Sequence, residues 1–148
     1  YNYEVETACN NFAIHPVDAE TWAGHMAEYN KPGGNHPLIV ADDGEGVCGY
    51  ASLSSFRSKG GYAPAVELSI YISPDHRGQG IGGKLMAAII DEARANQDTH
   101  AVISVITEGN QASVALHEKF GFEYCGSMKE IAFKHGAYRD MSFYELLV

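Results

Sequence analysis

A glycine-rich turn at residues 77–83 holds the residues of this sequence whose types and spacing most clearly suggest chemistry. Four glycines directly follow Arg77: Gly78, Gly80, Gly82 and Gly83. The turn lies between an apolar strand and an amphipathic helix that we expect to begin near Lys84. Glycines at a helix N-terminus leave backbone N–H groups unpaired and uncovered by side chains, and the helix dipole adds positive potential there. The turn therefore predicts a binding site for a phosphate-bearing ligand.

Glycine spacing alone fits three phosphate-binding patterns. The range Gly78–Gly83 contains the dinucleotide-binding spacing, but that pattern needs the turn directly after the strand, and Ser73–Arg77 intervene. The same range followed by Lys84 fits the P-loop spacing, yet Leu85 stands where a Ser or Thr hydroxyl would bind Mg²⁺. The third pattern is Arg77-x-x-Gly80-x-Gly82 behind a strand, and nothing in the surrounding sequence argues against it.

The periodicity around the turn predicts one α+β domain that covers residues 1–148. Apolar residues at period two predict strands, and apolar residues at helical spacing predict helices. We expect strands at 38–41, 47–53, 66–72, 101–106, 122–133 and 138–146, and helices at 18–29, from 84, and at 110–120. The last turn of a helix is expected at the N-terminus. The order indicates a hairpin, a central strand–helix–strand unit and a terminal strand pair.

Composition limits the class of ligand and partner. The 148 residues carry a formal net charge of −9, which disfavours binding to nucleic acid or to an anionic membrane. No apolar run approaches the roughly 20 residues of a spanning helix. The three cysteines are widely spaced without a CxxC pair, so we expect reduced thiols and a cytoplasmic protein. No His, Cys and Asp spacing suggests a metal site.

Two linked motifs resemble those of the GCN5-related N-acetyltransferase (GNAT) superfamily. In that family the Arg77-x-x-Gly80-x-Gly82 segment cradles the pyrophosphate of acetyl-CoA. After the next predicted strand, the range Asn110–Phe122 is similar to the family's N-x-x-[AS]-x-x-[LF]-Y-x-K-x-G-F segment. Within it Asn110, Ser113 and His117 follow at spacings of three and four residues, so they share one helix face. The resemblance implies the GNAT fold, a mixed, mostly antiparallel twisted sheet flanked by helices.

A narrower resemblance covers nearly the whole chain. It points to the phosphinothricin and methionine sulfoximine N-acetyltransferase branch, and it rests on Phe56-Arg57, Tyr62-Ala63, 66–74, and 133–136 followed by Asp140. The chain departs from that branch in two ways. By comparison with the family, strand 1 and most of helix 1 should precede Tyr1, so the GNAT domain is expected to be incomplete at its N-terminus. Tyr138 also stands where close relatives have Trp.

The resemblance assigns roles in acetyl transfer to an amine. Main-chain N–H groups around Ile70, Tyr71 and Ile72 would stabilise the oxyanion that develops on the thioester. Glu67, the one charged side chain of its strand, is our candidate for the general base, since a central strand is seldom wet on either face. His117 stands where many family members carry a Tyr thought to protonate the thiolate. It could act as base toward the amine or as acid toward sulfur.

Binding residues follow from the same resemblance. For acetyl-CoA we expect the backbone of seven consecutive residues, with the arginine side chain on phosphate: Arg77, Gly78, Gln79, Gly80, Ile81, Gly82 and Gly83. Asn110 and Ser113 should reach the pantetheine or phosphate arm, and Lys119 the 3′-phosphate. Arg57 beside Phe56 is the candidate partner of a substrate carboxylate, with Tyr62 and Lys134 as further pocket residues.

The sequence thus predicts an acetyl-CoA-dependent N-acetyltransferase that needs no metal. Its expected acceptor is a small amino-acid-like amine of the phosphinothricin, methionine sulfoximine or methionine sulfone type. Direct transfer in a ternary complex is expected, because no cysteine falls in a segment that we place at the thioester. The alternatives are a polyamine, an antibiotic or a protein N-terminus as acceptor, or an acyl-CoA-binding module without catalysis. The resemblance also implies a homodimer.

Overall fold

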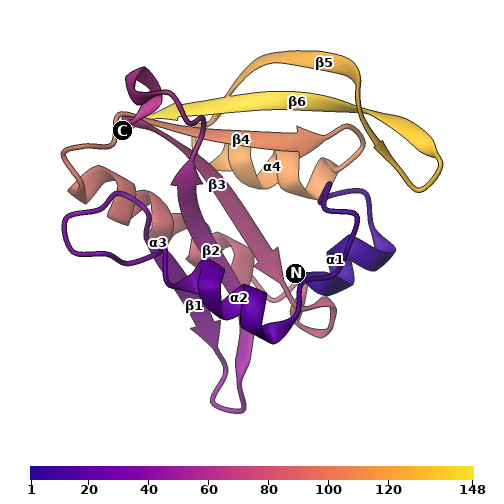
Figure 1. Cartoon of the computed structure of the whole chain (residues 1–148), viewed down its shortest axis with the longest axis horizontal. Coiled ribbons are helices and arrows are strands. Elements are labelled where there is room, and N and C mark those ends of the chain that lie inside the picture. The colour runs from indigo at the N-terminus through magenta and orange to yellow at the C-terminus, as the bar shows by residue number, and fades with distance from the viewer. The chain divides into compact units, whose positions relative to one another are not determined.

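The six strands form one mixed, mostly antiparallel sheet in the order β1-β2-β3-β4-β6-β5 (Figure 1). A computed structural model describes residues 1–148. The chain divides into two compact units. The larger unit comprises Glu28–Ser104 with Glu145–Val148, and the smaller unit comprises Tyr1–Ala27 with Val105–Tyr144. The expected α+β class and GNAT-type sheet are confirmed.

The larger unit contains the predicted hairpin and the predicted strand–helix–strand unit. β1 (Leu38–Asp42) and β2 (Val47–Ser55) are antiparallel. β2 is also antiparallel to β3 (Ala65–Ile72). The 3₁₀ turn η1 (Gly60–Tyr62) lies between β2 and β3. β3 then continues through a second 3₁₀ turn and helix α3 into β4 (Ala101–Thr107), to which it is parallel.

Helix α3 (Ile81–Ala95) supplies much of the core of the larger unit. Its buried residues are the five that the periodicity predicted: Leu85, Met86, Ile89, Ile90 and Ala93. Helix α3 packs against β1, β2 and β3 (Figure 1). The expected start near Lys84 is wrong by three residues, because the helix already begins at Ile81. Gly82 and Gly83 have no side chains to signal helical periodicity, yet they adopt helical backbone angles and form the first turn.

β3 and β4 pair over only a short stretch. Their parallel register joins Ala65 to Ala101, Val66 to Val102 and Glu67 to Ile103. On the other side, β3 stays paired with β2 over its whole length, from Ser55 opposite Val66 to Gly49 opposite Ile72. The C-terminal half of β3 is therefore paired with β2 on one side and is not paired with β4 on the other.

The smaller unit contains the N-terminal helices, the second motif helix and a long hairpin. Its helices are α1 (Asn2–Thr7), α2 (Ala19–Met26) and α4 (Gln111–Lys119). β5 (Glu123–Lys134) and β6 (Ala137–Leu147) form the hairpin (Figure 1), although the last residues of β6 belong to the larger unit. The turn between them consists of His135 and Gly136, both with positive φ, 50° and 75°. Two such residues match the right-handed twist of paired strands.

Two expectations at the N-terminus can be compared directly with the structure. Asp18 caps α2, as expected, because its carboxylate accepts a hydrogen bond from the backbone N–H of Thr21 at 2.8 Å. The helix ends at Met26 and does not reach Tyr29. None of its residues is buried, but the Trp22 ring packs on Tyr1 with ring centres 5.0 Å apart. No helix of the structure has both the length and the apolar character needed to cross a membrane.

The close approach of β2 and β3 at Gly49 gives a test of this packing. A Cβ at residue 49 would lie 2.9 Å from the carbonyl oxygen of Tyr71 and 3.2 Å from Cδ1 of Leu85. We expect Gly49→Ala to lower the free energy of unfolding by about 1–3 kcal/mol, measured by urea denaturation. Gly60→Ala is the matched control, because nothing lies within 4 Å of its Cβ position. Equal stability of the two variants would contradict this packing.

Candidate functional site

Glu67 lies half-buried on β3, opposite Ser54 of β2. Burial raises the pKa of its carboxyl, and the positive charge of Arg57 lowers it by less. The net effect is a glutamate that holds its proton more tightly than an exposed one. Such a shift brings a carboxyl nearer to the pH at which it can exchange protons with a substrate.

Three of the four residues predicted to bind a substrate form a cluster in the larger unit. The guanidinium carbon of Arg57 lies 5.1 Å from the centre of the Phe56 ring. Phe56 and Tyr62 meet edge to face, with ring centres 6.2 Å apart and an interplanar angle of 77°. The side chains of Arg57 and Tyr62 are exposed. The structure thus brings a cation and two aromatic rings together close to the half-buried carboxylate.

The stacking of two tyrosine side chains on the Glu67 face was missed by sequence reasoning. Tyr50 and Tyr71 are cross-strand partners, and their rings stack with centres 5.1 Å apart at 21°. Tyr71 lies four residues beyond Glu67, so the alternation of a strand places both side chains on the same face of the sheet. The register of β2 against β3 was the missing information, because single-strand periodicity does not reveal which residues are paired.

The ladder between β2 and β3 distinguishes the three predicted oxyanion donors. The N–H of Phe56 donates to Ala65 at 3.3 Å, and the N–H of Ser73 donates to Cys48 at 2.8 Å. In an antiparallel pair such bonds recur at every second residue, so the N–H of Tyr71 faces Tyr50. The N–H groups of Ile70 and Ile72 face the other side, beyond the rung at which the β4 ladder ends. Of the three predicted oxyanion donors, the N–H groups of Ile70 and Ile72 therefore remain candidates, and that of Tyr71 does not.

The glycine turn begins with η2 (Pro74–His76) and ends at α3. Gly78 and Gly80 have φ of 74° and 79°, which only glycine adopts without strain. Gly80 is the N-cap residue of α3 and provides no side-chain cap. By position, the N–H groups of Ile81, Gly82 and Gly83 have no acceptor four residues back within the helix. The structure therefore places a set of backbone donors where the sequence predicted an anion site.

In the smaller unit, a chain of hydrogen bonds joins the three residues predicted to share one face of α4. The Asn110 side chain caps the helix by accepting from the N–H of Ser113 at 3.2 Å. His117 Nδ1 lies 2.7 Å from the carbonyl oxygen of Ser113 and 3.4 Å from its hydroxyl. The shared face is therefore confirmed, and the bonds run from the first turn of the helix to the histidine.

The surroundings of His117 determine which ring nitrogen carries the hydrogen. The ring is buried and meets Phe122 edge to face, with ring centres 4.9 Å apart. Because a carbonyl oxygen only accepts, Nδ1 must carry the hydrogen, and Nε2 of the neutral ring then presents a lone pair. Burial lowers the pKa of His117, and the bond to the Ser113 carbonyl opposes this by less. The neutral form of the ring is therefore more favoured in His117 than in an exposed histidine.

The two predicted lysines have different surroundings. Lys119 is exposed in the last turn of α4. Lys134, expected as a substrate-pocket residue, is buried and donates from Nζ to the carbonyl oxygens of Glu4, at 3.2 Å, and Asn11. Its ammonium group thus contacts the N-terminal segment of the smaller unit. No group of three or more His, Cys, Asp or Glu side chains in the structure could hold a metal ion.

Comparison with known proteins shows the family to which these features belong. Residues 2–122 match the sequence model of the acetyltransferase (GNAT) family. The chain is 41% identical over 112 residues to an L-methionine sulfoximine/L-methionine sulfone acetyltransferase of Pseudomonas aeruginosa, covering 75% of this chain and 64% of the relative. It is 39% identical to the L-amino acid N-acyltransferase MnaT of Escherichia coli, covering 99% of this chain and 83% of the relative. The chain belongs to the GNAT family.

Solved structures agree with the fold. A ribosomal-protein-alanine N-acetyltransferase from Brucella melitensis superposes with a TM-score of 0.94 at 37% identity, covering 100% of this chain and 90% of that one. A phosphinothricin acetyltransferase from Sinorhizobium meliloti, solved in complex with acetyl-CoA, gives a TM-score of 0.90 at 34% identity, covering 98% of this chain and 77% of that one. The match to the Pseudomonas enzyme spans less than two thirds of that protein's length.

The opposing effects of burial and Arg57 on Glu67 can be separated by titration. Arg57→Ala removes the positive charge that lowers the pKa, so we expect the Glu67 pKa to rise further above its ordinary value. Carbon-13 NMR of the side-chain carboxyl as a function of pH measures this. Lys59→Ala, in the same loop, is the control and should leave the midpoint unchanged. A Glu67 midpoint that stays fixed or falls in Arg57→Ala would contradict the cluster.

Proposed function

We propose that this chain transfers the acetyl group of acetyl-CoA to the amine of a small amino-acid-like substrate. The acceptor class is that of phosphinothricin, methionine sulfoximine and methionine sulfone. The observation that carries this proposal is the half-buried Glu67 beside Arg57, which supplies a base for an amine and a cation for a carboxylate. The relatives that act on amino-acid-like substrates support the same class.

Acetyl-CoA is assigned to the glycine turn and to α4. The donors for its pyrophosphate are the backbone N–H groups and the Arg77 side chain of the range Arg77–Gly83, at the positive end of the α3 dipole. Asn110 and Ser113 are assigned to the pantetheine or phosphate arm, and Lys119 to the 3′-phosphate. The acetyl-CoA complex of the Sinorhizobium relative supports this cofactor.

The chemical step is direct transfer in a ternary complex. Glu67 accepts a proton from the ammonium group of the substrate, and the neutral amine attacks the carbonyl carbon of the thioester. The N–H groups of Ile70 and Ile72 donate to the oxyanion of the tetrahedral intermediate. The C–S bond then breaks, the nitrogen loses its second proton to a base, and the CoA thiolate takes up a proton. No acyl-enzyme is needed.

His117 is assigned to proton transfer in this step. Its neutral ring, with hydrogen on Nδ1, offers the Nε2 lone pair as a base and has no Nε2 hydrogen to give. This tautomer favours the base role over the acid role at the start of the reaction. Once Nε2 has accepted a proton, the same atom can return it to the thiolate.

A protein N-terminus is the second candidate acceptor. The Brucella structure, a ribosomal-protein-alanine N-acetyltransferase, superposes with a TM-score of 0.94. Thiol-release assays on methionine sulfone, on phosphinothricin and on an alanine-ended peptide would separate the two candidates. Turnover of the peptide without turnover of the amino acids would replace the first proposal. Binding of CoA without acetylation of any amine would instead identify a non-catalytic module.

Assembly and location complete the proposal. We assign a homodimer and a cytoplasmic location. The wide spacing of Cys9, Cys48 and Cys125, without a CxxC pair, supports the second assignment. Light scattering coupled to size-exclusion chromatography measures the mass in solution. A mass of one chain at micromolar concentration would rule out the dimer.

The base role predicts a specific kinetic signature. Glu67→Gln keeps the shape of the side chain but removes its capacity to accept a proton at neutral pH. We expect kcat to fall by about 10²–10⁴-fold at pH 7, while the KM for acetyl-CoA changes little. Steady-state kinetics with methionine sulfone measure both constants. An unchanged kcat would exclude Glu67 as the base.

The carboxylate role of Arg57 predicts selective loss of one substrate class. Arg57→Gln removes a charge-assisted hydrogen bond, so we expect kcat/KM for methionine sulfone to fall by about tenfold or more. The matching amine without the carboxylate should show a much smaller loss of kcat/KM. It also controls for the effect of Arg57 on Glu67, which both substrates share. Equal losses on the two substrates would refute the contact.

A further inference from the structure

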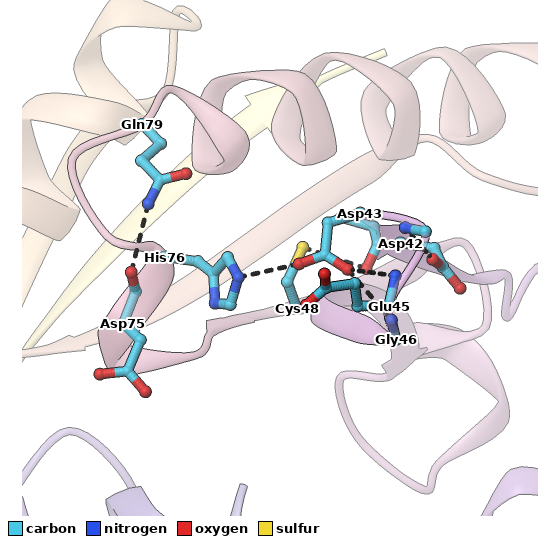
Figure 2. A network of polar contacts seen from close by, with 10 residues as sticks. Asp42, Asp43, Glu45, Gly46, Cys48, Asp75, His76 and Gln79 are labelled. Carbon is cyan, nitrogen blue, oxygen red and sulfur yellow. Dashed lines mark hydrogen bonds and ion pairs between the residues drawn. The ribbon is translucent and has the colours of Figure 1, made fainter.

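One side chain connects the glycine turn to a different part of the larger unit. His76 is the last residue of η2 and directly precedes Arg77. Its Nε2 lies 2.9 Å from Oδ2 of Asp43, in the turn that joins β1 to β2 (Figure 2). The two residues are 33 positions apart in sequence. The bond therefore links the proposed pyrophosphate turn to the β1–β2 hairpin.

The carboxylate of Asp43 is itself held in place by hydrogen bonds within the hairpin turn. Its other oxygen, Oδ1, accepts from the backbone N–H groups of Glu45 at 2.9 Å and Gly46 at 3.0 Å. These two bonds are the main reason why the pKa of Asp43 lies below its ordinary value, with a smaller effect from His76. The carboxylate is thus ionised and held by the hairpin itself, as the dashed lines in Figure 2 show.

The geometry also defines the tautomer of His76. An ionised carboxylate can only accept, so Nε2 carries the hydrogen and Nδ1 of the neutral ring presents a lone pair. Nδ1 is buried and has no hydrogen-bond partner. The imidazole therefore makes one directed bond, to Asp43, and no polar contact competes with it.

The turn that follows contains two glycines with open surroundings. Gly78 and Gly80 have positive φ, and no atom lies within 4 Å of the position where a Cβ would stand on either residue. Glycines carry the largest conformational freedom of any residue. Inside the turn, the Gln79 side chain donates to the Asp75 carbonyl oxygen at 3.2 Å, and this bond stays local (Figure 2). The Asp43–His76 bond reaches outside the turn, as does the N–H of Ser73, which donates to the Cys48 carbonyl oxygen at 2.8 Å.

We propose that His76 is a positioning residue for acetyl-CoA. Its bond to Asp43 fixes the start of the Arg77–Gly80 backbone, so that the N–H groups of the turn are already oriented for the pyrophosphate. Preorganisation of this kind raises affinity by removing the entropy that binding would otherwise cost. The inference rests on the proposed function, because it assigns a role only if the turn binds acetyl-CoA.

The test compares the affinity of the protein for acetyl-CoA with its turnover. We expect His76→Ala to raise the calorimetric Kd and the KM for acetyl-CoA about three- to tenfold, with kcat at saturation unchanged. His76→Gln, whose amide can still donate to Asp43, should recover most of the affinity. Glu45→Gln, in the same hairpin turn, is the control and should bind like the parent protein.

A double-mutant cycle links the effect to the bond. Asp43→Ser keeps an oxygen that can cap the hairpin turn but is too short to reach His76. Its loss of affinity should disappear in the His76→Ala background. Additive losses, or no loss in His76→Ala while the parent protein binds acetyl-CoA, would overturn the positioning role. Absence of acetyl-CoA binding by the parent protein would instead overturn the proposed function. Urea denaturation of each variant separates a folding defect from both outcomes.

Discussion

The short parallel ladder between β3 and β4 is the constraint on which the rest of the larger unit depends. It ends at Glu67, so the carboxylate lies on the last shared rung, and the N–H groups of Ile70 and Ile72 come after it. Continued pairing would use those donors within the sheet. The glycine turn and α3 then begin where the strand ends. In open α/β arrangements, ligands bind at the carboxyl ends of parallel strands, where neighbouring strands and loops separate.

Local dipoles must hold an anionic ligand in this protein, because the net charge of −9 repels it on average. Under the proposed function, backbone N–H groups at the start of α3 and a few cations bind this ligand. For Glu67, the nearby guanidinium of Arg57 offsets only part of the effect of burial on the pKa of the carboxyl. The electrostatic potential at the proposed site thus comes from nearby groups and not from the net charge of the protein.

Sequence reasoning predicted what periodicity and linked motifs encode. The buried face of α3 and the Asn110–Ser113–His117 face of α4 both follow from spacing along one element. The start of α3 was missed because glycines have no side chains to report their conformation. The Tyr50–Tyr71 stack, the Asp43–His76 bond and the contacts of Lys134 were missed for a different reason. They join residues far apart in sequence, so they depend on strand register and on how different elements pack together.

The N-terminal segment of the smaller unit shows how such contacts affect motion. Residues 8–17 form no helix or strand, and side-chain hydrogen bonds connect them to other parts of the smaller unit. Lys134 donates to the Asn11 carbonyl, Thr107 to that of Cys9 at 2.8 Å, and Asn2 to that of Val17 at 2.8 Å. A segment held at isolated points opens without unfolding the strands around it. Its amides should therefore exchange with solvent, and its peptide bonds become accessible to proteases, well before those of β5 and β6.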